Sequence, residues 1–349
     1  MGRFLAICGL GTLAAALSIV SVSAAGTTAA SRQTDATSPL AAFRRPAQAP
    51  HPTENVTTRA RAELGEALFF DPRLSSSGQM SCAACHEPSL GWQDGRPRGV
   101  GSGGVTLARR TPTLVDVAWV EPLFWDGRAA TLEEQAKGPL ASEHEMNMPL
   151  DRVVETVAAT PRYVAAFRTA YPGAPLTIDT VTKAIAAYER TLVSGEAPFD
   201  RWAAGDETAV SEPAKRGFAL YAGKARCVSC HSGWRFTDDG FRDIGLASPD
   251  VGRGEIVPGV PLLQHAFKTP TLRNVAERAP YMHDGSLPTL EAVVDHYDSG
   301  FVRRPSLAPQ MTPLRLTASE RADLVAFMRT LSSDRRAPVA QARLEGNDR

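Results

Sequence analysis

Two short motifs hold the residues of this chain that are best suited to chemistry. Residues 82–86 read Cys-Ala-Ala-Cys-His, and residues 227–231 read Cys-Val-Ser-Cys-His. In this C-x-x-C-H pattern, one helical turn presents two thiols to the vinyl groups of a haem, and the adjacent histidine reaches the iron. The spacing therefore predicts two covalently bound haem c groups. The attachment residues are Cys82, Cys85, Cys227 and Cys230, and the iron ligands are His86 and His231.

Other uses of paired cysteines fit these motifs less well. A zinc ribbon would place its two C-x-x-C pairs closer together. A thioredoxin-like pair belongs to a βαβ unit and needs no histidine after it. An exported chain would usually pair its cysteines as disulfides, but the histidine after each pair favours haem. The fifth cysteine, Cys8, lies in the apolar N-terminal run.

The N-terminus has the pattern of a signal peptide. Arg3 precedes an apolar run that ends near Val20, and small residues around Ala24 suit cleavage. We therefore expect residues 1–25 to be removed, which gives a periplasmic protein without a membrane span; a retained membrane anchor is the alternative. The formal net charge is zero, and no basic cluster indicates nucleic acid as a partner.

An internal repeat at an offset of 158 residues indicates two related domains. Residues 111–133 and 269–291 align without a gap, and twelve of the 23 positions are identical. Each copy follows one cysteine motif, so duplication is the simplest interpretation. The expected organisation is a signal peptide (1–25), a flexible leader (26–56), an N-terminal cytochrome c domain (57–205), a C-terminal cytochrome c domain (206–332) and a loose tail (333–349).

The hydrophobic pattern is helical throughout. Apolar residues recur at helical spacing in residues 153–167, with a break at Pro161, and again in residues 177–192 and 316–331. No segment alternates like a strand. The sequence therefore predicts an all-α fold of two cytochrome c-like domains, each with one covalent haem c and long loops around it.

The residue on the far side of each iron separates electron transfer from catalysis, because a catalytic haem keeps one face open. The candidate ligands for the second haem are Met282, His283, His296, Tyr297 and Met311. Tyr297 shares a helix face with Leu290 and Val294, whereas His296 is rotated away from it. Periodicity therefore favours Tyr297 as the ligand over His296, with a core tyrosine that binds no metal as the alternative.

The repeat places Pro139 opposite Tyr297, and proline cannot bind iron. The first haem is therefore expected to lack a protein ligand at this position. The polar residues nearby are Gln135, Glu143, His144 and Glu145. A carboxylate and an amide at an open haem suit peroxide, since cleavage of the O–O bond needs a proton carrier and stabilising dipoles. Solvated carboxylates at a helix end are the alternative.

The chain resembles the bacterial di-haem cytochrome c peroxidases and, among them, the MauG type. The resemblance covers about residues 57–332 and rests on the two haem motifs and on residues 124–128, 135–139, 145–146 and 279–285. It implies that His86 binds the peroxidatic haem and His231 the second haem. It also implies a distal pocket of Gln135, Pro139 and Glu145, with Glu145 as acid–base. Trp125 would relay electrons between the haems, unless it is a plain core tryptophan.

Three departures from the ordinary peroxidases are informative. Those proteins bind the second haem with methionine, whereas Tyr297 stands here, as in the MauG type; a phenolate favours oxidised iron and lowers the potential. Their loop histidine blocks the first haem at rest, but residues 99–104 contain none, and Ser102 falls near that place. Arg110 and Arg278 occupy the usual calcium positions and would repel Ca²⁺, so a calcium ion is doubtful.

The expected function is oxidation of an external donor by hydrogen peroxide. The donor would be a small periplasmic cytochrome or cupredoxin, or a protein substrate. One alternative is a cytochrome c peroxidase that only detoxifies hydrogen peroxide. The other is a di-haem electron carrier without enzymatic activity, which predicts two six-coordinate haems.

Overall fold

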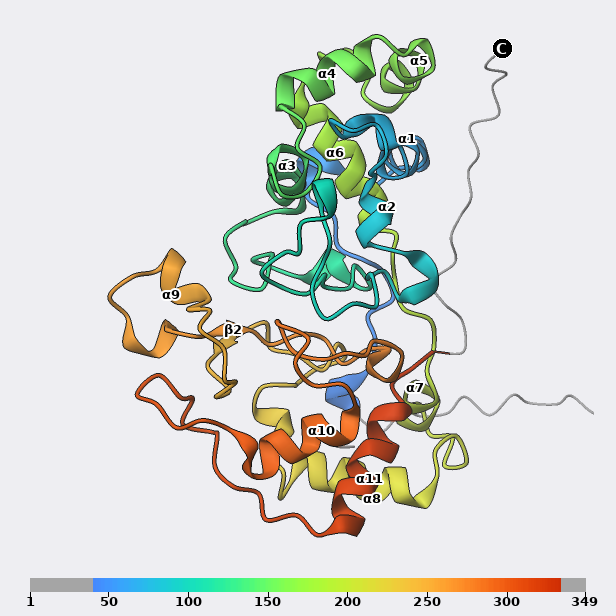
Figure 1. The fold of residues 1–349 in the computed structure, drawn as a ribbon. Coiled ribbons are helices and arrows are strands. Elements are labelled where there is room, and N and C mark those ends of the chain that lie inside the picture. The colour runs from blue at the N-terminus through green and yellow to red at the C-terminus, as the bar shows by residue number, and fades with distance from the viewer. Residues whose placement is uncertain (1–39, 334–349) are drawn as a thin grey trace, which may run out of the picture. The chain divides into compact units, whose positions relative to one another are not determined.

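The computed structural model describes residues 40–333 as helices joined by long loops (Figure 1). The α-helices in this part of the chain are α1 (Arg59–Phe69), α2 (Cys82–Cys85), α3 (Leu132–Ala141), α4 (Leu150–Ala158), α5 (Pro161–Ala170), α6 (Ile178–Glu189), α7 (Pro198–Ala203), α8 (Glu212–Ala222), α9 (Arg253–Ile256), α10 (Leu290–Asp295) and α11 (Ala318–Arg329). A π-helix, His296–Gly300, continues α10. Strands β1 (Phe241–Arg242) and β2 (Phe267–Lys268) pair antiparallel. This is the helical fold that the sequence predicts.

Short 3₁₀ helices occur in many of the connections. Their bounds are Ala41–Phe43, Thr53–Asn55, Pro72–Leu74, Pro88–Leu90, Ser102–Gly104, Val117–Trp119, Cys227–Ser229, Pro261–Leu263 and Val275–Glu277. The predicted signal peptide and most of the predicted tail lie outside the described residues. Within residues 40–333, no helix has the length and apolar character needed to cross a membrane.

The expected helices begin and end where their local signals stand. The Thr177 and Thr317 side chains accept hydrogen bonds from the third residue of α6 and α11, and each is part of a capping box. Pro161 stands at the first position of α5, where its missing N–H costs no hydrogen bond. Three of the predicted boundaries are therefore set by capping chemistry.

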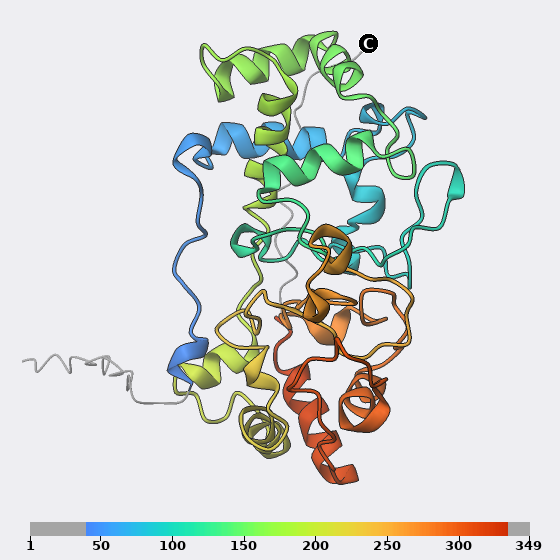
Figure 2. The same ribbon diagram turned by 90° about the vertical axis from the view of Figure 1, so that its left-hand side faces the viewer.

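Each half of the molecule is built on one pair of crossing helices. Figures 1 and 2 show α1 against α6 and α8 against α11. A Cβ atom on Gly65 of α1 would lie 1.9 Å from the carbonyl oxygen of Ala184, and one on Gly217 of α8 would lie 1.9 Å from that of Asp323. Only glycine permits so close an approach of two helix backbones. A glycine at the helix crossing therefore permits the close packing of the helix pair in both halves.

Two separate hydrophobic cores surround these helix pairs. The N-terminal core consists largely of aliphatic side chains from α1, α4 and α6, among them Leu64, Leu68, Val153, Val157 and Ile185. The C-terminal core is rich in aromatic rings, among them Phe199, Phe218, Phe236 and Phe327. Each half thus has its own packed interior.

The sequence repeat is also a structural repeat. Asp116 and Asn274, which are 158 positions apart, both adopt a left-handed backbone conformation. The Asp116 side chain accepts a hydrogen bond from the backbone N–H of Ser194 at 2.9 Å, and Asn274 accepts one from Ser333 at the same distance. These matched contacts tie each repeat segment to the end of α6 or α11. They support the interpretation of a duplication.

The segment from Leu40 differs from the expected flexible leader. Phe43 is buried and stacks on Phe236, with ring centroids 5.1 Å apart, so it belongs to the C-terminal core. Asn55 is buried in the other half, where its side chain donates to the Glu133 carboxylate at 2.7 Å. Composition alone did not reveal this, because one aromatic residue in a Pro- and Ala-rich stretch has no periodicity.

Candidate haem and peroxide site

One cavity of about 970 Å³ contains both C-x-x-C-H motifs. Its lining includes Cys85 and His86 from the first motif, and Cys227, Cys230 and His231 from the second. Cys82 lies one helical turn from His86, against the N-terminal core. All four motif cysteines are free thiols rather than disulfides. Sulfurs and histidines thus converge on one large space.

The two histidines are prepared in the same way to bind a metal. The Nδ1 atom of His86 lies 3.0 Å from the carbonyl oxygen of Trp92, and that of His231 lies 2.9 Å from that of Phe236. Because a carbonyl only accepts, Nδ1 carries the proton and Nε2 keeps its lone pair. Burial lowers the pKa of both imidazoles and so favours their neutral form. These residues fit a haem in each half.

The residues of the predicted peroxide pocket line the same cavity as His86. Gln135 and Pro139 are one turn apart on α3, and both line the cavity. Glu145, just beyond the helix, lines it as well, and burial raises the pKa of its carboxyl. Glu143 is exposed and is not part of the lining. Of the two acidic candidates, only Glu145 therefore reaches the cavity.

The loop at Ser102 packs against the backbone of the Glu145 segment. The Ser102 N–H lies 3.1 Å from the carbonyl oxygens of both His144 and Glu145. A Cβ on Gly101 would lie 1.7 Å from the His144 oxygen, so this close contact requires glycine. Ser102 is not among the residues that line the cavity. The loop thus supports the Glu145 segment from outside the cavity.

In the C-terminal half, Tyr297 lines the cavity together with Val293, and His296 does not. The His296 side chain is buried, and its Nε2 lies 2.8 Å from the carbonyl oxygen of Ile244. That nitrogen is engaged away from the cavity. Met282, His283 and Met311 also contribute to the lining. The placement of Tyr297 agrees with the predicted helix face.

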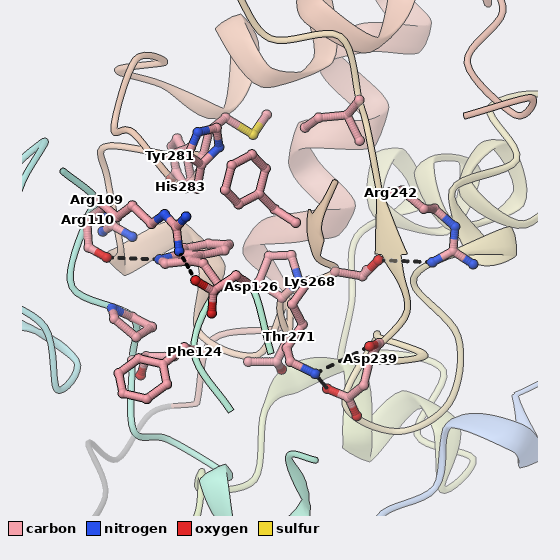
Figure 3. Close-up of a pocket in the computed structure, with 18 of the residues that line it drawn as sticks. Arg109, Arg110, Phe124, Asp126, Asp239, Arg242, Lys268, Thr271, Tyr281 and His283 are labelled. Carbon is pink, nitrogen blue, oxygen red and sulfur yellow. Dashed lines mark hydrogen bonds and ion pairs between the residues drawn. The ribbon is translucent and has the colours of Figure 1, made fainter. Parts of the chain in front are cut away.

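Trp125 lies where the two halves meet and is held by both. Its indole N–H donates to the carbonyl of Arg110 at 2.9 Å, and its own carbonyl accepts from the N–H of Lys268 at 2.8 Å. His283, which the repeat places opposite Trp125, packs against its ring with centroids 6.5 Å apart. Figure 3 shows Arg110 and His283 close together beside this junction. Trp125 is therefore held in place at the junction of the two halves, and it lines the cavity.

Charged residues of the two halves meet around the same junction. Arg109 forms an ion pair with Asp126 of its own half (Figure 3) and another with Asp250 of the other half at 2.7 Å. Arg110 and Lys268 are both buried and line the cavity. Each stands directly before a Thr-Pro-Thr-Leu segment, at the repeat offset. Sequence reasoning did not include Lys268 in the site, although the repeat contained the signal.

The comparisons with known proteins agree with this architecture. The family model described as di-haem cytochrome c peroxidase matches residues 59–208, and the cytochrome c model matches residues 214–332. The methylamine utilization protein MauG of Methylorubrum extorquens is 54% identical over 314 residues, which cover 89% of each chain. The cytochrome c551 peroxidase of Pseudomonas aeruginosa is 36% identical over 281 residues, or 77% of this chain and 78% of that protein.

Solved structures support the same conclusion. A MauG-like protein associated with microbial copper homeostasis matches with a TM-score of 0.76 and 30% identity, covering 85% of this chain and 96% of that chain. The di-haem peroxidase BthA from Burkholderia thailandensis matches with a TM-score of 0.71 and 25% identity, covering 82% of this chain and 90% of that chain. Cytochrome c domains of this kind bind haem c. The chain belongs to the di-haem cytochrome c peroxidase family, in its MauG-like branch.

Proposed function

We propose that this oxidoreductase reduces hydrogen peroxide in its N-terminal half and draws the electrons from an external donor through its C-terminal half. One observation supports this more than any other. A single cavity is lined by residues of both haem motifs, by Pro139 and Glu145 of the N-terminal half, and by Tyr297 of the C-terminal half. If haem binds at each motif, Pro139 could not serve as a ligand of the first iron, whereas Tyr297 could serve as a ligand of the second. That asymmetry suits a catalytic haem joined to an electron-transfer haem.

The N-terminal haem would be held by Cys82, Cys85 and His86, and it would supply the redox chemistry with peroxide. Glu145 would move a proton from the inner peroxide oxygen to the outer one, which would leave as water. The two electrons for cleavage of the O–O bond would come from the haems. The donor would return these electrons, and with two further protons the second oxygen would also leave as water. The raised pKa of Glu145 suits both accepting and donating the proton, because burial shifts the pKa of the carboxyl upward, towards neutral pH. Gln135 donates its amide N–H to the peroxide.

The C-terminal haem would be held by Cys227, Cys230 and His231, with Tyr297 on the far side. Burial raises the pKa of the Tyr297 phenol, so its anion needs a nearby positive charge. Trp125 carries electrons between the two centres. Its indole and its carbonyl are both engaged in hydrogen bonds, which keeps its ring in place.

The donor is an oxidisable protein or a small redox protein of the periplasm, the compartment that the predicted signal peptide indicates. Two relatives, at 54% and 50% identity, are named for methylamine utilization. That name favours a protein of methylamine oxidation as the substrate over simple removal of peroxide.

Rapid mixing of the purified, fully oxidised protein with hydrogen peroxide tests this proposal. Electron paramagnetic resonance should first detect one high-spin and one low-spin haem, because Pro139 leaves one iron face open. Peroxide should then change the spectra of both haems without added reductant. Only low-spin iron, together with no reaction with peroxide, would refute the proposed function.

A further inference from the structure

Two buried arginines line the haem cavity without a carboxylate partner among residues 40–333. Arg110 belongs to the N-terminal half and Arg278 to the C-terminal half, and each is only 6% exposed. Other arginines of the lining have acidic partners: Arg109 pairs with Asp250 at 2.7 Å, and Arg242 with Asp238 at 2.6 Å. Arg98 and Arg226 also line the cavity without an ion pair, but both are exposed to solvent. Among the described residues of the lining, Arg110 and Arg278 are therefore the buried arginines that lack one.

The hydrogen bonds of these two arginines leave their charges uncompensated. Arg110 donates from Nη2 to the side chain of Gln93 and to the backbone carbonyl of Arg278, the latter at 2.5 Å. Its Nε has no partner. Arg278 donates from Nη2 to the carbonyl of Thr271 at 2.7 Å. All of these acceptors are neutral.

Two neighbouring cations in a buried place are costly. Removal of a charge from water costs several kcal/mol unless an opposite charge is near. Burial lowers the pKa of Arg110 to about 10, and burial with the neighbouring Arg110 lowers that of Arg278 to about 10. The carboxylates of Asp94, Asp116 and Glu277 attract these charges without forming an ion pair with either guanidinium, and burial still lowers both pKa values. An anion in direct contact would offset the remaining cost.

The expected cofactor carries such an anion. Each haem bears two propionate carboxylates, and a guanidinium matches a carboxylate with two parallel hydrogen bonds. The backbone of Arg110 is anchored at the junction, since its N–H donates to His283 at 2.7 Å and its carbonyl accepts from Trp125. Arg110 thus lies at the junction of the two halves, close to His283 (Figure 3).

We propose that Arg110 and Arg278 bind haem propionates at the junction of the two halves and supply the positive charge there. The inference rests on the proposed function, because it requires haem in both halves. It gives each arginine a partner, and it makes a metal cation at this place unnecessary. The arginines also hold positive charge beside Trp125, so they influence how readily each haem accepts an electron.

Neutral variants test the proposal through the haem potentials. Arg110→Gln and Arg278→Gln each remove one cation, which should stabilise oxidised iron. Spectroelectrochemistry should detect a lower potential for at least one haem, with a tenfold or larger change in the reduction equilibrium, or ~59 mV for one electron. Arg110→Lys should keep most of the charge effect. Arg152→Gln, at an exposed ion pair on α4, is the matched control and should change nothing.

Haem counting by mass spectrometry distinguishes failure of the proposed function from failure of the arginine proposal. Unchanged protein without two haems would refute the proposed function. Two-haem Gln variants with unaltered potentials would overturn only the arginine assignment. If those variants do not fold, the haem potentials of the unchanged protein are measured during titration with Ca²⁺ and with a chelator. Potentials that do not change with either support the proposal, and potentials that change with Ca²⁺ overturn it.

Discussion

The two halves of the molecule share one framework and differ at single positions within it. Gly65 and Gly217 permit the same helix crossing, and His86 and His231 are oriented by the same kind of backbone carbonyl. In the N-terminal half, Asp116 ties the repeat segment to the residues that follow α6, and in the C-terminal half Asn274 ties it to those that follow α11. Shared positions therefore determine how each half would hold a haem.

The positions that differ include those that would touch the iron or lie between the irons. At the repeat offset of 158, Pro139 stands opposite Tyr297, Trp125 opposite His283, and Arg110 opposite Lys268. The helix itself also differs, because α3 runs regularly to Ala141, whereas α10 gives way to a π-helix at His296. Such local changes are frequent at functional sites. A duplicated framework can thus acquire two roles through few substitutions.

Removal of the attachment thiols should have the largest effect on haem content, because it leaves only one half of the molecule able to hold a haem. Cys82→Ser with Cys85→Ser leaves one haem and no reaction with peroxide, because the open site is lost. Cys227→Ser with Cys230→Ser also leaves one haem, but the remaining one is the high-spin haem. Mass spectrometry and electron paramagnetic resonance distinguish the two products. A full haem content in either double variant would contradict covalent attachment.

Glu145→Gln should slow peroxide cleavage by ~10²–10⁴-fold, the usual contribution of a positioned acid–base. Glu143→Gln is the matched control, since Glu143 is exposed and outside the lining, and its rate should not change. In the unchanged protein, the rate should fall as the pH drops through the raised pKa of Glu145, because only the carboxylate accepts the proton. Glu145→Gln should lose this dependence. Stopped-flow rates across pH provide the check.

Substitution of Tyr297 would make the second half resemble an ordinary peroxidase. Tyr297→Met should raise the potential of that haem, because neutral methionine stabilises reduced iron. Tyr297→Phe should leave its far side open and increase the high-spin signal. Tyr171→Phe serves as the control, because Tyr171 is buried in the N-terminal core and is not part of the cavity lining. If Tyr297→Phe kept the low-spin spectrum and the potential, the ligand would be another residue.

The smallest expected effect concerns stability. Glu189 near the end of α6 is buried with an unpaired Oε2, whereas α11 has Met328 at the matching position of its helix crossing. Burial raises the pKa of Glu189 to about 8. The folded protein therefore keeps a proton that the unfolded chain releases above its ordinary pKa near 4.5, so stability falls as the pH rises from about 4.5 to 8.

Glu189→Gln should remove that decline and stabilise the protein at pH 8 by ~1–3 kcal/mol. Denaturant unfolding at pH 5 and at pH 8 measures it, and Glu155→Gln on the exposed face of α4 is the control. An equal change in the free energy of unfolding at both pH values would show that the Glu189 carboxyl does not titrate as proposed.

Much of this protein could be predicted from short-range patterns in the sequence. The spacing within residues 82–86 and 227–231 indicated haem attachment, and the repeat offset indicated two domains of one kind. The periodicity that links Leu290, Val294 and Tyr297 placed the tyrosine on the inner helix face. These signals are local, because helix geometry alone determines which residues share a face.

Tertiary packing decided the rest. Glu143 and Glu145 are the same residue type two positions apart, so the sequence does not distinguish them. The turn after α3 brings only Glu145 to the cavity. Phe43 is buried in the C-terminal core, although no periodic pattern of apolar residues around it predicts this burial. Arg110 and Arg278 are 168 residues apart, yet Arg110 donates to the carbonyl of Arg278. Such pairs form because the two halves pack together, and no spacing along the chain records which side chains that packing buries.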